Sequence, residues 1–280
     1  ATMQEHQRYF PVRDAQGKLM PWFITVSNIE SRDPSQVIAG NERVVRPRLT
    51  DAAFFYKTDR QHPLETQVDR LKRVTFQTQL GSQHDKSERV RALAQAIAAT
   101  IGGDPALADR AAMLSKCDLL TNMVAEFPEL QGLMGRYYAL HDHEPAEVAE
   151  ALREQYLPRF AGDALPATRT GMALSIADKL DTIAGIYATG QKPTGTRDPF
   201  GLRRAALGLL RTSIEHGLDL DLQQLIEQAV AAALADMARV ATGQGKPLGA
   251  IDADKLAVEV YNYVIERLRA YYVEGTADIT

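Results

Sequence analysis

The stretch from Gly185 to Arg204, GIYATGQKPTGTRDPFGLRR, joins two predicted helices. The first helical pattern ends at Gly190, and Asp198-Pro199 predicts the start of the second, because Asp caps free amides and Pro suits the first helical position. The loop between them offers cations, hydroxyls and backbone amides, which suit phosphate. A capped loop with solvated charges is the alternative interpretation. The candidate phosphate ligands are Lys192, Thr194, Thr196, Arg197, Arg203 and Arg204.

Composition limits the class of protein. The chain has 280 residues, of which 45% are hydrophobic and 24% charged, as expected for a globular protein of one or two domains. Its net charge of −4 gives no general attraction to nucleic acid, so such binding would use local basic patches. The one cysteine, Cys117, excludes an intrachain disulfide and a cysteine-based zinc site, and it fits a reducing cytosol. No apolar run approaches the ~20 residues of a membrane span.

The first sixty residues predict a small α/β segment. Two strands, at Tyr9–Val12 and Leu19–Val26, flank a turn at Asp14–Gly17. Asp33-Pro34 predicts a helix start, and we expect a kink or break at Pro47, because proline lacks the amide donor that a helix needs.

A second group of cations lies on this predicted helix. Arg43, Arg46 and Arg48 are a weaker candidate for a phosphate-facing patch. They fit equally well as a solvated helix face, or as buried partners of Glu42 and Asp51.

From Leu64 onward the periodicity predicts helices throughout. The fold class is therefore mainly α, a helical domain preceded by a small α/β segment. We expect three parts: an α/β segment over 1–62 that belongs to a larger upstream domain, a helical domain over 63–217, and a helical linker or body segment over 218–280. The expected helices cover 90–101, 105–124, 145–156, 168–187, 200–215, 222–240 and 252–272, with a flexible link over 243–249.

Three polar strings could be taken for metal sites. Residues 141–144, His-Asp-His-Glu, and the pair His84-Asp85 are consecutive, whereas a metal gathers ligands from separate elements. Both strings also precede predicted helices, where polar caps belong. Asp178 and Asp181 share one helix face and could bind a metal, but no histidine at helical spacing supports them. A structural role is the favoured alternative, either as capping carboxylates or as buried acids paired with Lys179 or a nearby arginine.

Longer strings carry a family resemblance. They resemble the β subunit of bacterial heterotetrameric glycyl-tRNA synthetase, over nearly the whole chain. Since members of that family are much longer, the resemblance implies that this chain is a middle portion. The strings are EHQRYFPV, GKLMPWFITVSNI, GNERVVRPRLTDAAFFYKTD, KCDLLTNMVAEFPELQGLMG, ADKLDTIAGIYATGQKPTGTRDPFGLRR and VIERLRAYY.

The resemblance implies a role in protein biosynthesis. In that family the α subunit is the class II catalytic core, which activates glycine with ATP and charges the tRNA, while the β subunit is required for tRNA recognition. The expected partners are therefore the α subunit, in an α2β2 heterotetramer, and glycine tRNA, in the cytoplasm and with no membrane. This chain would be part of a ligase without a catalytic centre or a cofactor of its own.

The helical part is also similar to a degenerate HD domain. HD phosphohydrolases hold a divalent metal with a His, a His-Asp pair and a later Asp. The corresponding positions here are Leu93, Ser115-Lys116 and Asp178, so only the last acid is kept. A lysine puts positive charge where the cation would bind, which predicts loss of the metal. Lys116 could pair with Asp178 instead.

Three functions follow from these observations. The leading one is a noncatalytic, tRNA-binding portion whose phosphate contacts position the acceptor stem of glycine tRNA towards the α subunit. The alternatives are a metal-dependent HD-type phosphohydrolase and a purely structural docking module for the α subunit.

Overall fold

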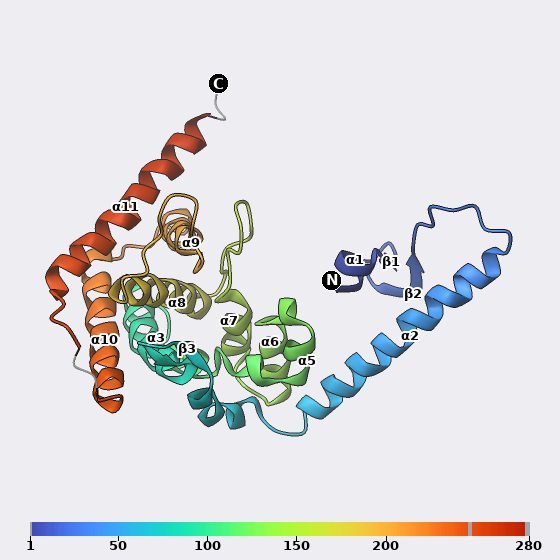
Figure 1. The fold of residues 1–280 in the computed structure, drawn as a ribbon, viewed down its shortest axis with the longest axis horizontal. Coiled ribbons are helices and arrows are strands. Elements are labelled where there is room, and N and C mark those ends of the chain that lie inside the picture. The colour runs from blue at the N-terminus through green and yellow to red at the C-terminus, as the bar shows by residue number, and fades with distance from the viewer. Residues whose placement is uncertain (1, 246–247, 278–280) are drawn as a thin grey trace. The chain divides into compact units, whose positions relative to one another are not determined.

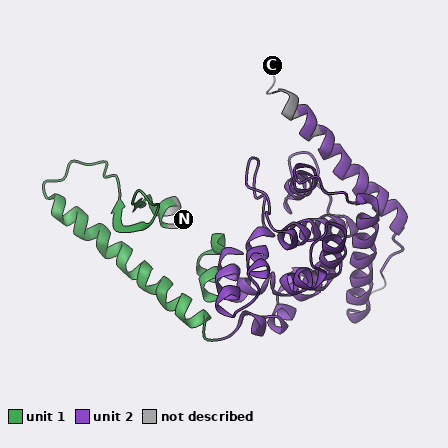
Figure 2. Ribbon diagram, turned by 180° about the vertical axis from the view of Figure 1, so that it is seen from behind, with its two compact units in different colours: residues 1–61, 121–131 green, residues 62–120, 132–280 purple. Residues whose placement is uncertain are grey.

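The computed structural model describes residues 2–245 and 248–277 and divides into two compact units. Unit 1 comprises residues 1–61 and 121–131, and unit 2 comprises residues 62–120 and 132–280 (Figure 2). The fold is mainly α, as predicted, with two small antiparallel sheets. None of the described helices is long and apolar enough to cross a membrane.

Unit 1 contains a hairpin and one long helix (Figure 1). The helix α1 (Thr2–Gln7) precedes strands β1 (Phe10–Arg13) and β2 (Leu19–Ile24), which pair antiparallel as predicted. Helix α2 (Pro34–Asp59) begins after Asp33, whose carboxylate accepts hydrogen bonds from the amides of Ser35 and Gln36. We expected a kink or break at Pro47, and the break is wrong, because α2 runs unbroken through it. An interior proline costs a helix about 3 kcal/mol, which the remaining turns of a 26-residue helix can outweigh.

Residues 121–131 join unit 1 through the end of α2. This segment contains α5 (Asn122–Glu126) and a 3-10 turn (Pro128–Leu130). The Asp59 carboxylate accepts hydrogen bonds from the backbone amides of Asn122 and Met123 at 2.9 and 3.0 Å. The last residue of α2 therefore satisfies free amides in the first turn of α5.

Unit 2 is built around α8 (Arg169–Ala188), a helix buried along nearly its whole length. Apolar side chains cover all sides of α8, so it forms the centre of the core rather than one amphipathic wall. Gly190, with a φ of 75°, ends it as predicted. The helices that contact α8 are α3 (Gln83–Thr100), α4 (Pro105–Leu114), α7 (Ala146–Glu154), α9 (Leu202–Glu215), α10 (Leu222–Gly243) and α11 (Ala253–Ala277), while α6 (Leu133–His141) packs on α7.

Several predicted elements of unit 2 differ from the structure. Residues 64–82 are not helical throughout, but form 3-10 turns (Leu64–Gln67, Asp69–Arg73) and a second hairpin, β3 (Thr75–Gln77) with β4 (Gly81–Ser82). The helix predicted over 105–124 ends at Leu114 and is followed by a 3-10 turn (Cys117–Leu120). The apolar spacing continues past Leu114 because residues on both sides of the break are buried. Helix α6 was not predicted, and residues 246–247 of the predicted link lie outside the described residues.

Candidate functional site

The loop between α8 and α9 is held in shape by its own backbone. Thr194 and Arg197 form a β-bridge in which each amide donates to the other's carbonyl oxygen, at 3.1 and 2.8 Å. The Asp198 carboxylate accepts hydrogen bonds from the amides of Leu202 and Arg203 at 2.8 and 2.9 Å. Asp198 therefore caps α9, but from a position before it, because the helix begins at Leu202 after Gly201 in a left-handed conformation. The predicted helix start at Asp198-Pro199 is wrong by three residues, since Gly201 takes the cap position and Leu202 is the first helical residue.

The cations of this loop and of the first turn of α9 fall into two groups, those with a partner within the protein and those without an ion pair in the described ranges. Lys192 forms an ion pair with Glu259 of α11, at 2.5 Å, and Arg203 donates to the carbonyl oxygen of Gly195, also at 2.5 Å. The side chains of Arg197 and Arg204 are exposed, and within the described ranges no carboxylate forms an ion pair with either. Two guanidinium groups thus lie open to solvent, one on the shaped loop and one in the first turn of α9.

The loop also supplies neutral groups that a phosphate can use. Thr194 and Thr196 are exposed, so both hydroxyls can donate outward. Together with Arg197 and Arg204, they provide charged and neutral donors within one short segment.

The second candidate patch lies on α2 in unit 1. Arg43, Arg46 and Arg48 are all exposed, so their interpretation as buried ion-pair partners is wrong. Arg46 is 3.9 Å from Glu42, and Arg48 is 3.2 Å from Glu126 of α5. Exposed pairs of this kind contribute little to stability, so these arginines can exchange partners with a ligand.

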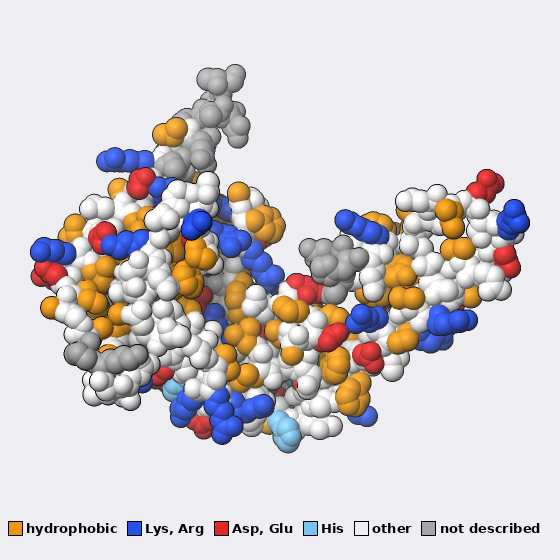
Figure 3. All heavy atoms as spheres, viewed as in Figure 1, with side chains coloured by type: hydrophobic (Ala, Val, Ile, Leu, Met, Phe, Trp, Pro, Cys, Tyr) orange, Lys and Arg blue, Asp and Glu red, His pale blue; other side chains and the backbone are white. Residues whose placement is uncertain are grey.

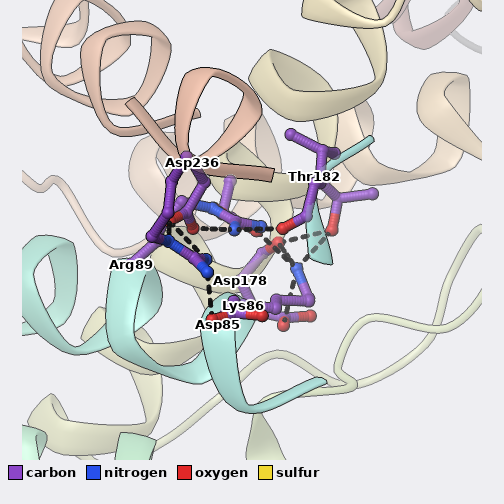
Figure 4. Close-up of polar contacts among 9 residues, drawn as sticks. Asp85, Lys86, Arg89, Asp178, Thr182 and Asp236 are labelled. Atoms are coloured by element: carbon purple, nitrogen blue, oxygen red, sulfur yellow. Dashed lines mark hydrogen bonds and ion pairs between the residues drawn. The ribbon is translucent and has the colours of Figure 1, made fainter. Parts of the chain in front are cut away.

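Unit 2 contains a buried cluster of opposite charges. From α3, Lys86 donates to the Asp181 carboxylate at 2.9 Å and to the Thr182 hydroxyl at 2.8 Å. Arg89, also on α3, donates to Asp181 at 2.6 Å and to Asp236 of α10 at 2.6 Å. Figure 4 shows how these side chains reach across from three helices. The cluster therefore ties α3, α8 and α10 together.

Asp178 lies between two lysines of this cluster. Its carboxylate oxygen Oδ1 is 3.0 Å from Lys116 Nζ and 3.3 Å from Lys86 Nζ. Lys116 also donates to Gln155 at 2.7 Å and lies 4.8 Å from the centre of the Tyr156 ring. The ion pair between Lys116 and Asp178, which the sequence offered as the replacement for a metal, is thus present.

The electrostatics of the cluster follow from burial and from these partners. Burial alone would raise the pKa of Asp178, but Lys116 and Lys86 hold the pKa of that carboxyl well below its usual range. Lys86 and Arg89 lower the pKa of Asp181 in the same way. Lys179 donates to carbonyl oxygens and to the Ser175 hydroxyl, and burial lowers its pKa to about 7.

The other positions related to an HD site do not converge on Asp178. Leu93 lies in the hydrophobic core, and the α3 side chain that reaches Asp178 is Lys86, seven residues earlier. The Ser115 hydroxyl donates to the carbonyl oxygen of Ala112. Lys86 and Arg89 were missed by the sequence analysis. Their helical spacing with Val90 and Leu93, which places cations on a buried stripe, was a signal that could have found them.

The polar strings near helix starts have structural roles. Ser82 and Asp85 form a reciprocal capping box at the start of α3. Glu144 pairs with Arg110 at 2.5 Å, and Asp142 accepts a hydrogen bond from the Leu64 amide at 2.6 Å. In the part of the chain that the structure describes, no three His, Cys, Asp or Glu side chains are grouped so that they could hold a metal ion.

Comparison of the whole sequence with known proteins shows the family of this chain. The family model of the glycyl-tRNA synthetase beta subunit matches residues 1–279, and the chain belongs to that family. It is similar to the glycine–tRNA ligase beta subunits of Pseudomonas putida strain W619 (55% identity over 279 residues) and of Hahella chejuensis (54% over 275 residues). These alignments cover 99% and 98% of this chain but only 39% and 38% of the relatives, so the chain spans about two fifths of their length.

Proposed function

We propose that this chain is a noncatalytic, tRNA-binding portion of a glycine–tRNA ligase β subunit. It helps to position the acceptor stem of glycine tRNA for aminoacylation by the α subunit, which uses the ATP, within a cytoplasmic α2β2 heterotetramer. The observation that carries this proposal is the pair of exposed guanidinium groups at the shaped junction between α8 and α9, Arg197 on the loop and Arg204 in the first turn of α9. Family membership over nearly the whole chain supports the α subunit as the protein partner and glycine tRNA as the RNA ligand.

The geometry of the loop suits a positioning role. Phosphate contacts fix the register of a nucleic acid without reading its sequence, and helical RNA is recognised mainly through its backbone and shape. A loop braced by the Thr194–Arg197 bridge and by Asp198 loses little conformational entropy when it binds. Arg43, Arg46 and Arg48 are a second candidate for backbone contacts, and they belong to the other unit.

The absence of a catalytic centre in this chain is also part of the proposal. We interpret residues 63–217 as a degenerate HD-like domain in which lysines have replaced the metal. The Lys116 and Lys86 ammonium groups, at 3.0 and 3.3 Å from Asp178, supply the positive charge that a divalent ion would otherwise bring. Only one acid of the metal-binding pattern remains, which is too few for a divalent site.

Steady-state charging by the complete α and β subunits tests this function. Replacing Arg197 and Arg204 together by Ala should lower kcat/KM for glycine tRNA by about tenfold, as expected for two lost phosphate contacts. The rate of glycyl-adenylate formation without tRNA should stay unchanged, because the loop does not serve that step. Arg73→Ala, at an exposed arginine elsewhere in unit 2, is the matched control and should change neither rate. Equal charging by the double variant and the control would remove the role we assign to the loop.

The phosphohydrolase alternative makes a different prediction. It requires a divalent ion at Asp178, where Lys116 and Lys86 already lie. We therefore expect the purified β subunit to contain no stoichiometric divalent metal, and chelation to leave its melting temperature unchanged. One bound metal per chain, together with phosphoester hydrolysis that Asp178→Asn abolishes, would support the hydrolase instead.

A further inference from the structure

Phe160 is an aromatic side chain that the fold leaves in water. It is 63% exposed, more than any other aromatic residue among the described residues of unit 2. The loop that carries it, residues 155–168, joins α7 to α8 and rises beside α9 (Figure 1). A single exposed apolar side chain is common in proteins and has no meaning by itself. The setting of Phe160 therefore decides whether it has a role.

A hydrogen-bonded turn fixes the backbone at Phe160. The Asp163 amide donates to the Phe160 carbonyl oxygen at 3.2 Å, and Gly162 takes the left-handed conformation, with a φ of 78°, that the third position of a type II turn requires. The Asp163 carboxylate accepts hydrogen bonds from the amides of Arg159 and Ala164 at 2.7 and 2.9 Å. Because the turn is already closed, a ligand that binds the ring has little backbone to order.

Two contacts hold this turn against α9. The Arg211 guanidinium donates to the Asp163 carbonyl oxygen at 3.3 Å. A Cβ at Gly208 would lie 3.3 Å from Pro158 Cδ, so the loop packs closely on the helix at this glycine. Arg204 lies four residues before Gly208 and therefore on the same side of α9. The turn and the exposed Arg204 guanidinium are thus neighbouring parts of one surface.

This surface combines aromatic rings with cations. Phe200, in the loop between α8 and α9, is 40% exposed, and Arg159, next to Phe160, is exposed as well. Arg197 and Arg204 are the two exposed arginines described above. Figure 3 shows hydrophobic and basic side chains side by side on the face that carries these loops. Proteins that bind unpaired nucleotides use this combination, because cations contact the phosphates and aromatic rings stack on the bases.

We propose that Phe160 stacks on a base of the unpaired 3′ end of glycine tRNA. The inference rests on the proposed function, in which cations of this surface hold the acceptor stem, and the strand that continues from that stem is single-stranded in tRNAs generally. Bases inside a helical stem are stacked on one another, so only an unpaired nucleotide has a free face for the ring. A protein partner would need a broader apolar face than the one ring that this turn presents.

The affinity of the complete α and β subunits for glycine tRNA tests this contact. Phe160→Leu keeps an apolar side chain but removes the aromatic face, and it should weaken binding about fivefold, the lower end of the range for one stacked base. Phe160→Trp should bind at least as well as the native enzyme. Tyr137→Leu, at an aromatic residue of α6 that is 45% exposed, is the matched control and should leave the affinity unchanged.

A shortened tRNA identifies the base. When the unpaired 3′ end is removed, the native enzyme and Phe160→Leu should bind the tRNA equally well, because the stacking partner is gone. Equal affinity of the two proteins for intact tRNA would overturn the proposal. So would a loss that persists with the shortened tRNA, or a loss of α subunit binding in the absence of tRNA, which would show that the ring contacts protein.

The result is separable from the test of the proposed function. If replacement of Arg197 and Arg204 weakens tRNA binding while Phe160→Leu does not, the stacking contact fails and the phosphate contacts stand. If Phe160→Leu weakens binding of intact tRNA alone while the double arginine variant binds normally, the stacking contact stands and the role of the two arginines fails.

Discussion

Lys116 places its ammonium group 3.0 Å from the Asp178 carboxylate, where the two side chains are only 7% and 16% exposed. A buried ion pair adds little net stability over an apolar pair, but removal of one partner leaves a buried charge without compensation. Lys116, which we propose stands where a metal would lie, is therefore also expected to stabilise unit 2.

Lys116→Met should destabilise the protein by about 3 kcal/mol in urea unfolding, because Asp178 then keeps only Lys86 as a nearby cation. Asp178→Asn in the same background should restore part of the lost stability, since the carboxylate that has lost one of its two lysine partners is then neutral. Lys72→Met, which removes an exposed pair with Asp69, should leave the unfolding midpoint unchanged. A Lys116→Met midpoint as high as that of Lys72→Met would contradict this account.

Lys179 should make stability depend on pH in a defined window. Burial is the main cause that lowers its pKa from 10.5 to about 7, and the neighbouring Lys116 and Lys86 lower it further, against Asp178. Between these two pH values the unfolded chain binds the proton that the folded chain has lost, so stability rises with pH from about 7 to about 10. Below pH 7 both states carry the proton, and the full cost of burying the charge remains.

Urea unfolding at pH 7 and pH 9 measures this dependence. The native protein should gain stability over that interval by up to about 1.4 kcal/mol per pH unit from this group. Lys179→Met should flatten the profile, because the methionine side chain does not titrate. The same slope in both proteins would show that another group is responsible.

At the scale of elements, the ion pair between Lys192 and Glu259 couples the loop between α8 and α9 to α11. Lys192 lies 2.5 Å from Glu259, and its ammonium group is 5.7 Å from the centre of the Tyr187 ring. A phosphate that uses Lys192 has to displace the Glu259 carboxylate. The helix α11 therefore limits how strongly the loop attracts an anion.

Glu259→Gln should raise the affinity of the complete enzyme for glycine tRNA by about two- to fivefold, the range of an exposed pair. A double-mutant cycle identifies the cause, because the gain should disappear when Lys192 is also replaced by Ala. Glu266→Gln, at an exposed carboxylate of the same helix, controls for the general loss of negative charge. A gain that persists without Lys192 would count against a specific contact.

Local signals predicted some elements well and others poorly. The turn at Asp14–Gly17 and the stop at Gly190 were predictable because glycine at positive φ fixes both. The continuity of α2 through Pro47 was not predictable, because it depends on the stability summed over all turns of a long helix. The start of α9 at Leu202 was not predictable either, because it depends on the left-handed conformation of Gly201.

The candidate site was predicted in a similarly uneven way. The charges of the loop are visible in the sequence, and the prediction that its cations bind tRNA stays a prediction. Lys192 already forms an ion pair with Glu259, which lies more than fifty residues away along the chain, so the sequence alone does not show that this cation has a partner. Lys86 and Arg89 were missed because their acidic partners come from α8 and α10, and only the tertiary fold brings these helices together.

At the scale of the whole molecule, the chain is acidic overall, yet its exposed arginines lie in both units. A net charge of −4 gives no general attraction to RNA, so binding must come from local patches. Since the chain spans about two fifths of its relatives' length, other parts of a β subunit would share the affinity. One loop should therefore change the affinity by a moderate factor and not abolish it.

The most direct measurement is the affinity of the complete α and β subunits for glycine tRNA as a function of salt, with Arg197 and Arg204 both replaced by Ala. Loss of two phosphate contacts should weaken binding by about tenfold and reduce the slope of log K against log salt by about 1 to 2. Arg73→Ala should leave both the affinity and the slope near the native values. An unchanged affinity and an unchanged salt slope in the double variant would contradict the central claim that this loop contacts the tRNA backbone.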